Sequence, residues 1–171
     1  MRAAVLIAIV LLRVGGRPSV PALGAQAVLF AASPADDPLG HLARKVFDLA
    51  NRQRRLHDVR PLEWSNALAQ QARLQSANMM ERGFFSHTDP VRGKLAVRLT
   101  AAGIRWSRCG ENIFREKGMD DPADAAVEGW MQSPAHREGL LDPLFTQAGV
   151  GIAISRDTEY FITETFIGPP K

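Results

Sequence analysis

The order of the predicted elements favours an α+β domain in which helices flank an antiparallel sheet. Apolar residues recur at helical spacing through most of the chain, and near the C-terminus they alternate with a period of two. The composition agrees, since 46% hydrophobic and 23% charged residues are typical of globular chains. A length of 171 residues fits one domain that is large enough to bury a core.

Residues 1–27 have the pattern of a secretory signal peptide. Arg2 precedes an apolar run over 3–12, and the segment ends on Ala-Gln-Ala. We expect cleavage there, a linker over 28–40 and a folded domain over 41–168. The run is shorter than the roughly 20 residues of a membrane-spanning helix, so no stable membrane span is expected, although an uncleaved interfacial anchor is an alternative. An extracellular or periplasmic location follows.

The charge balance argues against a nucleic-acid-binding protein, and the cysteine content excludes a disulfide-bonded fold and a zinc finger. Without Arg2, Arg13 and Arg17 of the leader, 18 Lys+Arg face 18 Asp+Glu, so no nucleic-acid partner is expected. Cys109 is the single cysteine, which excludes an internal disulfide and a cysteine-based zinc finger. In its apolar surroundings it is expected to be a small buried side chain rather than a reactive thiol.

Two helices are predicted in the first half of the domain. The first begins at Pro38 and continues toward Leu56, and a loop follows. Trp64, expected in the core, leads into the second helix, which Ser65 or Asn66 caps and Gly83 ends. The second helix has an apolar stripe of mostly small residues, namely Leu68, Ala72, Ser76 and Met79. These small residues predict close packing against another element.

Two Asp-Pro pairs predict the starts of two further helices, because Asp suits the N-cap and Pro the first helical position. Asp89-Pro90 would begin a helix that ends at Gly103. Asp121-Pro122 would begin a helix that buries Trp130. The stretch 104–114 between them is expected to be irregular or extended.

The last third of the chain changes its period. Ser133 and Pro134 would interrupt the fourth helix, and Ser133 would cap a short turn that holds His136. Apolar residues then alternate from Val150 to Ile154, and a second strand-like segment follows a polar tetrad. This pattern predicts a β-hairpin.

Two histidines and one glutamate are the candidates for chemistry. His87 and His136 each lie at a loop-to-helix junction, whereas His41 and His57 have surface contexts. Glu111 lies in an apolar stretch, where a carboxylate must be paired, protonated or exposed to a cleft. The alternative is that Glu111 accepts backbone N–H groups and only holds a loop.

Six motifs occur in one order along the chain. They are Asn51-x-x-Arg54, Pro61-Leu62-x-Trp64, Phe85-Ser86-His87, Gly110-Glu111-Asn112-Ile113, Trp130-x-x-Ser133-Pro134-x-His136-Arg137 and Gly149-Val150-Gly151. Through them the chain, over about 42–167, resembles the short bacterial members of the CAP superfamily (cysteine-rich secretory proteins, antigen 5 and pathogenesis-related 1 proteins), also called SCP domains. The resemblance implies a three-layer α-β-α sandwich with a small antiparallel sheet between helical layers, and a secreted domain with an open cleft.

The same resemblance implies a cleft site that carries two His and two Glu and binds a divalent cation such as zinc in some members. His87, Glu111 and His136 match three of its four positions, while Ser133 stands where the other glutamate would be. Asn112 and Ser133 are expected to border the cleft. Zinc on His87 and His136 is therefore expected to be weakly bound, because closed sites use four protein ligands.

Three functions remain open. The first is a secreted binding module whose cleft, with Phe84 and Phe85, takes a lipid, peptide or glycan, tuned by a cation; the resemblance implies small apolar or other extracellular ligands. The second is a metal-assisted hydrolase, a peptidase, with Glu111 as the general base for water on zinc held by His87 and His136. The third is a structural or adhesion domain of the cell envelope.

Overall fold

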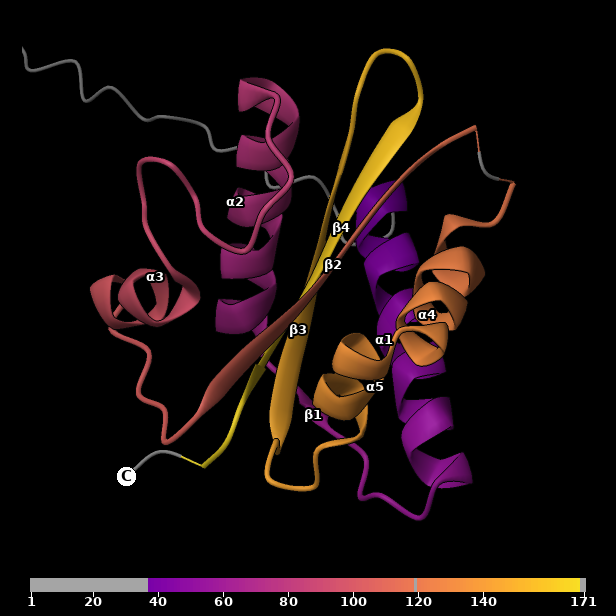
Figure 1. Cartoon of the computed structure of the whole chain (residues 1–171), viewed down its shortest axis with the longest axis vertical. Coiled ribbons are helices and arrows are strands. Elements are labelled where there is room, and N and C mark those ends of the chain that lie inside the picture. The colour runs from indigo at the N-terminus through magenta and orange to yellow at the C-terminus, as the bar shows by residue number, and fades with distance from the viewer. Residues whose placement is uncertain (1–36, 119, 170–171) are drawn as a thin grey trace, which may run out of the picture. The chain divides into compact units, whose positions relative to one another are not determined.

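The computed structural model of the protein describes residues 37–118 and 120–169 (Figure 1). The expected signal peptide, 1–27, lies outside the described residues, as does most of the expected linker. The last residues of that linker, 38–40, are helical, because helix α1 begins at Pro38. None of the helices in the described part of the chain is long and apolar enough to cross a membrane.

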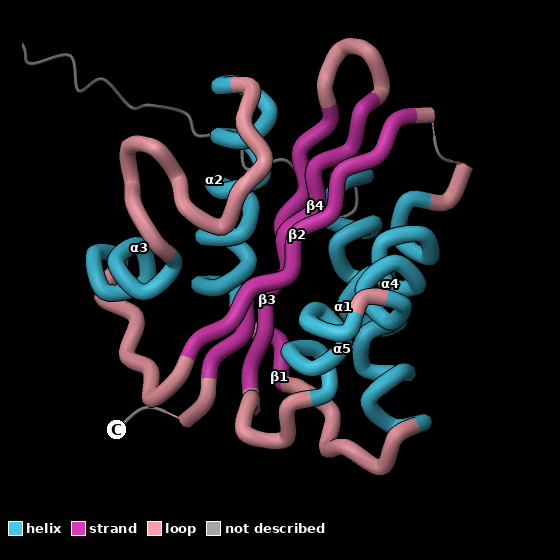
Figure 2. Tube along the Cα trace, viewed as in Figure 1, coloured by secondary structure: helices cyan, strands magenta, loops and turns pink. Residues whose placement is uncertain are grey.

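The described residues form three layers. In chain order the elements are α1 (Pro38–Leu56), β1 (Glu63–Trp64), α2 (Asn66–Arg82), α3 (Leu95–Ala101), β2 (Cys109–Lys117), α4 (Pro122–Gln132), α5 (Pro134–Leu141), β3 (Gln147–Ile154) and β4 (Glu159–Ile167). Helices α2 and α3 lie on one side of the sheet, and α1, α4 and α5 lie on the other (Figures 1 and 2). The α+β class and the three-layer α-β-α sandwich are thus confirmed.

The sheet has the strand order β1-β3-β4-β2. The predicted hairpin is present as β3 and β4, and β2 pairs antiparallel with β4 from Cys109↔Ile167 to Lys117↔Glu159. The short β1 is parallel to β3. The stretch expected to be irregular or extended thus contains a regular strand. The polar residues at its start hide the alternation, and long-range pairing with β4 supplies the hydrogen bonds that order it.

Three of the predicted helix ends are confirmed. Ser65 caps α2 by accepting a hydrogen bond from the backbone N–H of Leu68 (3.4 Å). Gly83 ends α2 in the left-handed conformation with φ of 66°. The carboxylate of Asp121 caps α4 by accepting from the N–H of Asp124.

The Asp89-Pro90 helix start is wrong, because α3 begins at Leu95. Asp89 is instead a buried residue that closes a tight turn, in which its carboxylate accepts from the backbone N–H groups of Val91 and Arg92. The backbones of Asp89 and Gly93 bond to each other, and Gly93 has φ of 80°, which no helix accommodates. The residue types of an N-cap therefore serve a tight turn here.

Helix α2 packs directly on β3, as the small stripe predicts. All four stripe residues are fully buried. A Cβ on Gly149 would lie 2.1 Å from the backbone nitrogen of Ala69, and one on Gly151 would lie 1.9 Å from that of Arg73. The Ser76 hydroxyl donates to the carbonyl of Gly151 (2.9 Å). Glycines on the strand thus admit the helix backbone.

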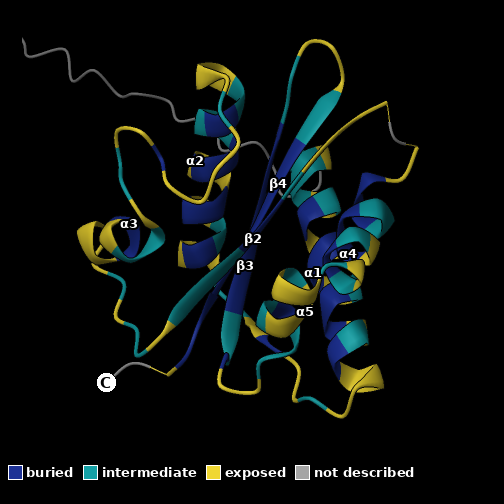
Figure 3. Ribbon diagram, in the orientation of Figure 1, coloured by how far each residue is buried: buried dark blue, intermediate teal, exposed yellow. Residues whose placement is uncertain are grey.

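The larger core lies on the opposite face of the sheet, under α1 and α4 (Figure 3). Trp130 is 1% exposed, and its indole N–H donates to the carbonyl of Ile113 (3.1 Å). Trp64, expected in the core from the sequence, is only half-buried, because β1 lies at the edge of the sheet. Its ring contacts Phe47 edge-on and carries the guanidinium of Arg44 at 3.7 Å.

Candidate functional site

Glu111 lies on β2 between a histidine and an arginine. One carboxylate oxygen pairs with Nδ1 of His87 (3.1 Å), and the other accepts from Nη2 of Arg98 (2.9 Å). The side chains of Glu111 and Arg98 are 2% and 0% exposed, whereas that of His87 is 51% exposed. Glu111 is thus a buried, paired carboxylate that fixes one nitrogen of an exposed imidazole. It bonds side chains, and not the backbone N–H groups of the alternative hypothesis.

Ser133 holds the second imidazole. Its hydroxyl lies 2.9 Å from Nδ1 of His136, in the first turn of α5. The predicted side-chain cap at Ser133 is absent from this helix start, where only the carbonyl of Ser133 bonds the N–H of Arg137. Partial burial lowers the pKa of His136, and the charge of His87 lowers it further. The neutral imidazole is therefore favoured at His136.

Asn112 connects the strand that carries Glu111 to the helix that carries His136. Its side chain is buried, and its amide donates to the backbone carbonyl of His136 (3.1 Å). This bond ties β2 to the start of α5. Since Asn112 is the neighbour of Glu111 on the strand, one short stretch of β2 contacts both the imidazole of His87 and the backbone of His136.

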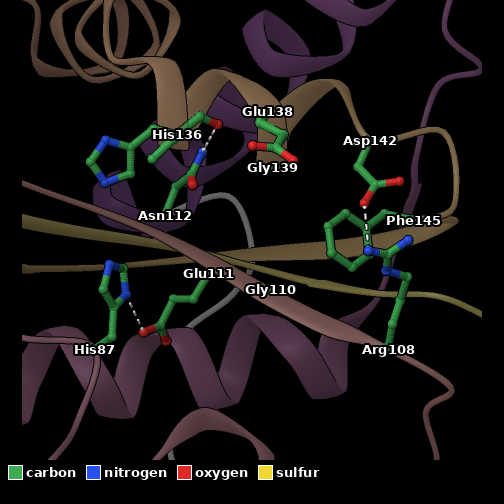
Figure 4. Close-up of a pocket in the computed structure, with 11 residues that line it drawn as sticks. His87, Arg108, Gly110, Glu111, Asn112, His136, Glu138, Gly139, Asp142 and Phe145 are labelled. Atoms are coloured by element: carbon green, nitrogen blue, oxygen red, sulfur yellow. Dashed lines mark hydrogen bonds and ion pairs between the residues drawn. The ribbon is translucent and has the colours of Figure 1, made fainter.

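The two imidazoles, Glu111 and Asn112 converge on a pocket of about 330 Å³ (Figure 4). It is lined by His87, Arg108, Gly110, Glu111, Asn112, Ala135, His136, Glu138, Gly139, Asp142 and Phe145. His87 and Glu111 also line an adjoining pocket of about 300 Å³ with Leu95, Ala96 and Cys109. The rings of His87 and His136 lie 6.3 Å apart between centroids. Ser133 does not line the pocket and touches it only through His136. The expected aromatic lining is also different, since Phe145 lines the pocket and Phe84 and Phe85 do not.

The far end of the pocket is closed by an ion pair and a ring. Arg108 and Asp142 lie 3.1 Å apart, and the guanidinium of Arg108 lies over the ring of Phe145 (Figure 4). A Cβ on Gly110 would lie 2.7 Å from that ring, so only glycine lets Phe145 approach the strand.

Comparison with known proteins decides the family. Residues 47–166 match the CAP family, described as the cysteine-rich secretory protein family. The chain belongs to this family. The CAP domain is 34% identical over 125 residues to the uncharacterized protein YkwD of Bacillus subtilis, a match that covers 73% of this chain and 46% of YkwD. It is 37% identical over 124 residues to the uncharacterized membrane protein YlbC of the same species, covering 72% of this chain and 34% of YlbC.

Solved structures agree with this assignment. An extracellular protein containing an SCP domain from Bacillus anthracis is 32% identical and superposes with a TM-score of 0.66, over 75% of this chain and 41% of that one. Our chain therefore spans less than half the length of these curated relatives and of that structure.

Several site residues of the CAP domain were not predicted from the sequence. Arg98, Arg108, Glu138, Asp142 and Phe145 belong to loops or to short helices with no motif of their own. Arg98 alone carried a signal, because it lies on the same helical stripe as Leu95 and Leu99, where a buried arginine needs an acidic partner. His41 and His57 are exposed, as expected.

The two imidazoles are suited to a loosely held cation. Glu111 and Ser133 occupy their Nδ1 atoms, and the Nε2 atoms of both rings have no hydrogen-bond partner among the described residues. Such outer partners orient metal-binding histidines. The 6.3 Å between the rings leaves room for one ion about 2 Å from a nitrogen of each. Within the described part of the chain, however, no three His, Cys, Asp or Glu side chains form a metal-binding group.

Proposed function

We propose that the CAP domain is an extracellular binding module whose cleft takes a polar ligand of the peptide or glycan class. The observation that carries this proposal is the lining of the pocket. Arg108, Glu138 and Asp142 present charges of both signs beside the two imidazoles, and Phe145 is the one large apolar side chain among the lining residues. Such a surface matches the mixed donors and acceptors of a peptide or a sugar better than a lipid tail.

The extracellular location rests on the leader pattern and on the relatives. Residues 1–27 have the composition of a secretory signal. The structurally similar SCP-domain protein of Bacillus anthracis is described as extracellular.

The hydrolase hypothesis receives less support from the geometry. A general base must reach the proton that it abstracts. Both oxygens of Glu111 are engaged, by His87 and by Arg98, and its side chain is 2% exposed. This arrangement favours a positioning role, in which Glu111 orients the imidazole of His87.

Weak zinc binding at His87 and His136 is part of the proposal. Bound zinc would supply a positive charge that attracts a carboxylate or hydroxyl group of the ligand. The protein itself contributes the two imidazoles and their orienting partners, Glu111 and Ser133. Only two imidazoles are available, so most of the coordination is left to water and the ligand.

A titration of the full chain with three probes tests the proposal. The probes are a pool of mixed hexapeptides, chitotriose and octanoate, followed by amide chemical shifts. We expect the peptide or the sugar to shift the signals of Asn112 and Gly139, and His87→Ala to weaken that binding at least fivefold. The matched control, His41→Ala, changes an exposed histidine outside the cleft and should leave binding unchanged.

Two results would contradict the proposal. Binding of octanoate alone would assign the cleft to lipids. No saturable shift with any probe would support the structural or adhesion role instead.

A further inference from the structure

Another pocket lies beside the cleft and is lined by residues of α2, of α3 and of the loops on either side of α3. It measures about 280 Å³, and its lining is Gln71, Arg92, Arg98, Ala101 and Ala102. Helices α2 and α3 lie side by side on this face of the sheet (Figure 1). Arg98 belongs to both sites, because its Nη2 atom also bonds Glu111 of the cleft.

The two arginines of this pocket have more N–H groups than partners. Nη2 of Arg92 donates to the amide oxygen of Gln71 (2.6 Å), and Nη2 of Arg98 donates to Glu111 and to the carbonyl of His87. Nη1 of Arg92, together with Nε and Nη1 of Arg98, is buried and has no hydrogen-bond partner among the described residues. Buried donors without acceptors are costly and uncommon in folded proteins.

The neighbouring carboxylates are already occupied. Asp89 accepts from the backbone N–H groups of Val91 and Arg92 and from the amide of Asn78 (2.7 Å). Glu111 divides its two oxygens between His87 and Arg98. These carboxylates offset the charge of the arginines but make no bond to the three free donor atoms.

The two guanidinium groups also repel each other. Burial lowers the pKa of Arg92 and the charge of Arg98 lowers it further, although the carboxylates of Asp89 and Glu111 act in the opposite direction. Like charges held together next to a pocket favour a counter-charge inside it. Guanidinium groups bind oxyanions through pairs of parallel N–H bonds, which is the chemistry that the free donors provide.

We propose that this pocket binds a tetrahedral oxyanion, a phosphate or sulfate group, through Arg92 and Arg98. The anion accepts the hydrogen bonds that the described residues leave unmade. Binding requires small rotations of the two side chains, because these N–H groups are buried in the structure described. The inference does not depend on the ligand of the cleft.

Calorimetric titration of the full chain with inorganic phosphate, at constant ionic strength set by sodium chloride, tests this site. We expect saturable binding in the calorimeter. In a parallel NMR titration, phosphate should shift the Nε–H signal of Arg98. Arg92→Gln should weaken binding at least tenfold. The matched control, Arg105→Gln, removes an exposed arginine just beyond α3 and should leave the affinity unchanged.

Gln71→Glu keeps the test decisive if Arg92→Gln fails to fold. This variant places a carboxylate where the amide now accepts from Arg92, so the protein would supply its own anion. We expect phosphate binding to be lost while the melting temperature without phosphate stays the same or rises. Phosphate binding by Gln71→Glu at wild-type affinity would overturn the proposal, as would equal weakening in Arg92→Gln and Arg105→Gln.

Hexyl phosphate distinguishes the two sources of such a group. Ala101 also lines an adjoining apolar pocket with Val97 and Trp106, which could receive a short alkyl chain. Equal affinity for inorganic and hexyl phosphate would identify a free oxyanion as the ligand. Tighter binding of hexyl phosphate would identify a phosphate ester on an apolar chain, and no binding of either would overturn the site.

Discussion

Glu164 is a fully buried carboxyl group in the middle of β4, paired in register with Asn112 of the cleft. Both of its oxygens lack a hydrogen-bond partner among the described residues. Burial raises its pKa to about 8, although the nearby charge of Arg54 counteracts part of this effect. The side chain is therefore protonated at neutral pH in the folded protein.

This shift makes stability depend on pH. The ordinary pKa of 4.5 applies to the unfolded chain, so between pH 4.5 and about 8 the unfolded state binds fewer protons than the folded state. The free energy of unfolding must then fall as pH rises through this range. Glu164→Gln removes the titration, and its stability relative to wild type should increase by roughly 3 kcal/mol between pH 5 and pH 7.5.

Urea unfolding at the two pH values measures this difference. Glu128→Gln, at an exposed position on α4, is the matched control and should show no such change. A difference between Glu164→Gln and wild type that stays constant from pH 5 to pH 7.5 would show that Glu164 is ionised when folded.

Protonation of the His136 imidazole should weaken the proposed zinc binding. Only a neutral imidazole binds a metal, and an ordinary one titrates near pH 6.5. Zinc affinity should therefore fall at least tenfold between pH 7.5 and pH 5.5, mainly below pH 6.5, because the pKa of His136 is lowered. Calorimetry with zinc chloride at the two pH values measures this change in affinity. A zinc affinity that does not change with pH would assign the metal to other ligands.

Ser133→Ala removes the partner of Nδ1 on His136 and should weaken zinc binding about tenfold at pH 7.5, as measured by the same calorimetry.

At the scale of elements, glycines decide how closely helix and strand approach. A Cβ at Gly151 of β3 would meet backbone atoms of α2 at 1.9 Å, and backbone cannot rotate away as a side chain does. A Cβ at Gly129 of α4 would meet only the ring of Phe114, at an ordinary 3.6 Å. Gly151 is thus required by close packing, whereas Gly129 is a helix residue that only lowers the helix propensity of α4.

Alanine at the two positions should have opposite effects on stability. Gly151→Ala should lower the free energy of unfolding by about 3 kcal/mol or more, because α2 must move off the sheet. Gly129→Ala should raise it by about 0.5–1 kcal/mol through helix propensity. Chemical denaturation of both variants gives the comparison. An unchanged free energy of unfolding in Gly151→Ala would show that α2 packs less closely on β3 than the approach of Gly151 to the backbone of Arg73 implies.

At the scale of the whole molecule, Arg54 connects α1 to the wall of the cleft. Its side chain is fully buried and donates to the carbonyls of Arg60, Leu140, Asp142 and Phe145. Asp142 and Phe145 line the pocket, so an arginine at the C-terminal end of α1 holds a loop 88 residues away.

Arg54→Leu should therefore affect both stability and the cleft. It leaves four carbonyls without their donor, and we expect a loss of about 3–5 kcal/mol, typical of a broken buried polar network. Hydrogen exchange should increase most in 140–146. Arg54→Lys restores one charge and should recover part of the stability, and uniform exchange across the domain would contradict the specific link to this loop.

Local patterns predicted much of the CAP domain because they depend on neighbours in the chain. Ser65, Gly83 and Asp121 act within one helical turn, and the stripe of α2 shows its buried face through spacing alone. His87, Glu111 and His136 entered through motifs, so they could be named before their distances were known. Asp89-Pro90 shows the limit of prediction from local patterns, since the same pair of residue types suits a helix start and a tight turn equally well.

The contacts of the site residues could not be predicted from the sequence and are known only from the tertiary structure. The pairing of Glu111 with Arg98, the hold of Ser133 on His136 and the four bonds of Arg54 all depend on which loops the sheet brings together. The same holds for β2, a strand ordered by β4, and for Glu164, whose carboxyl group is buried in the middle of β4. Caps and periodicity are local, so the sequence was enough to predict α1, α2, α4, the hairpin and the candidate side chains. Hydrogen-bond partners, burial and pKa come from residues far apart in the chain, so they exist only once it has folded.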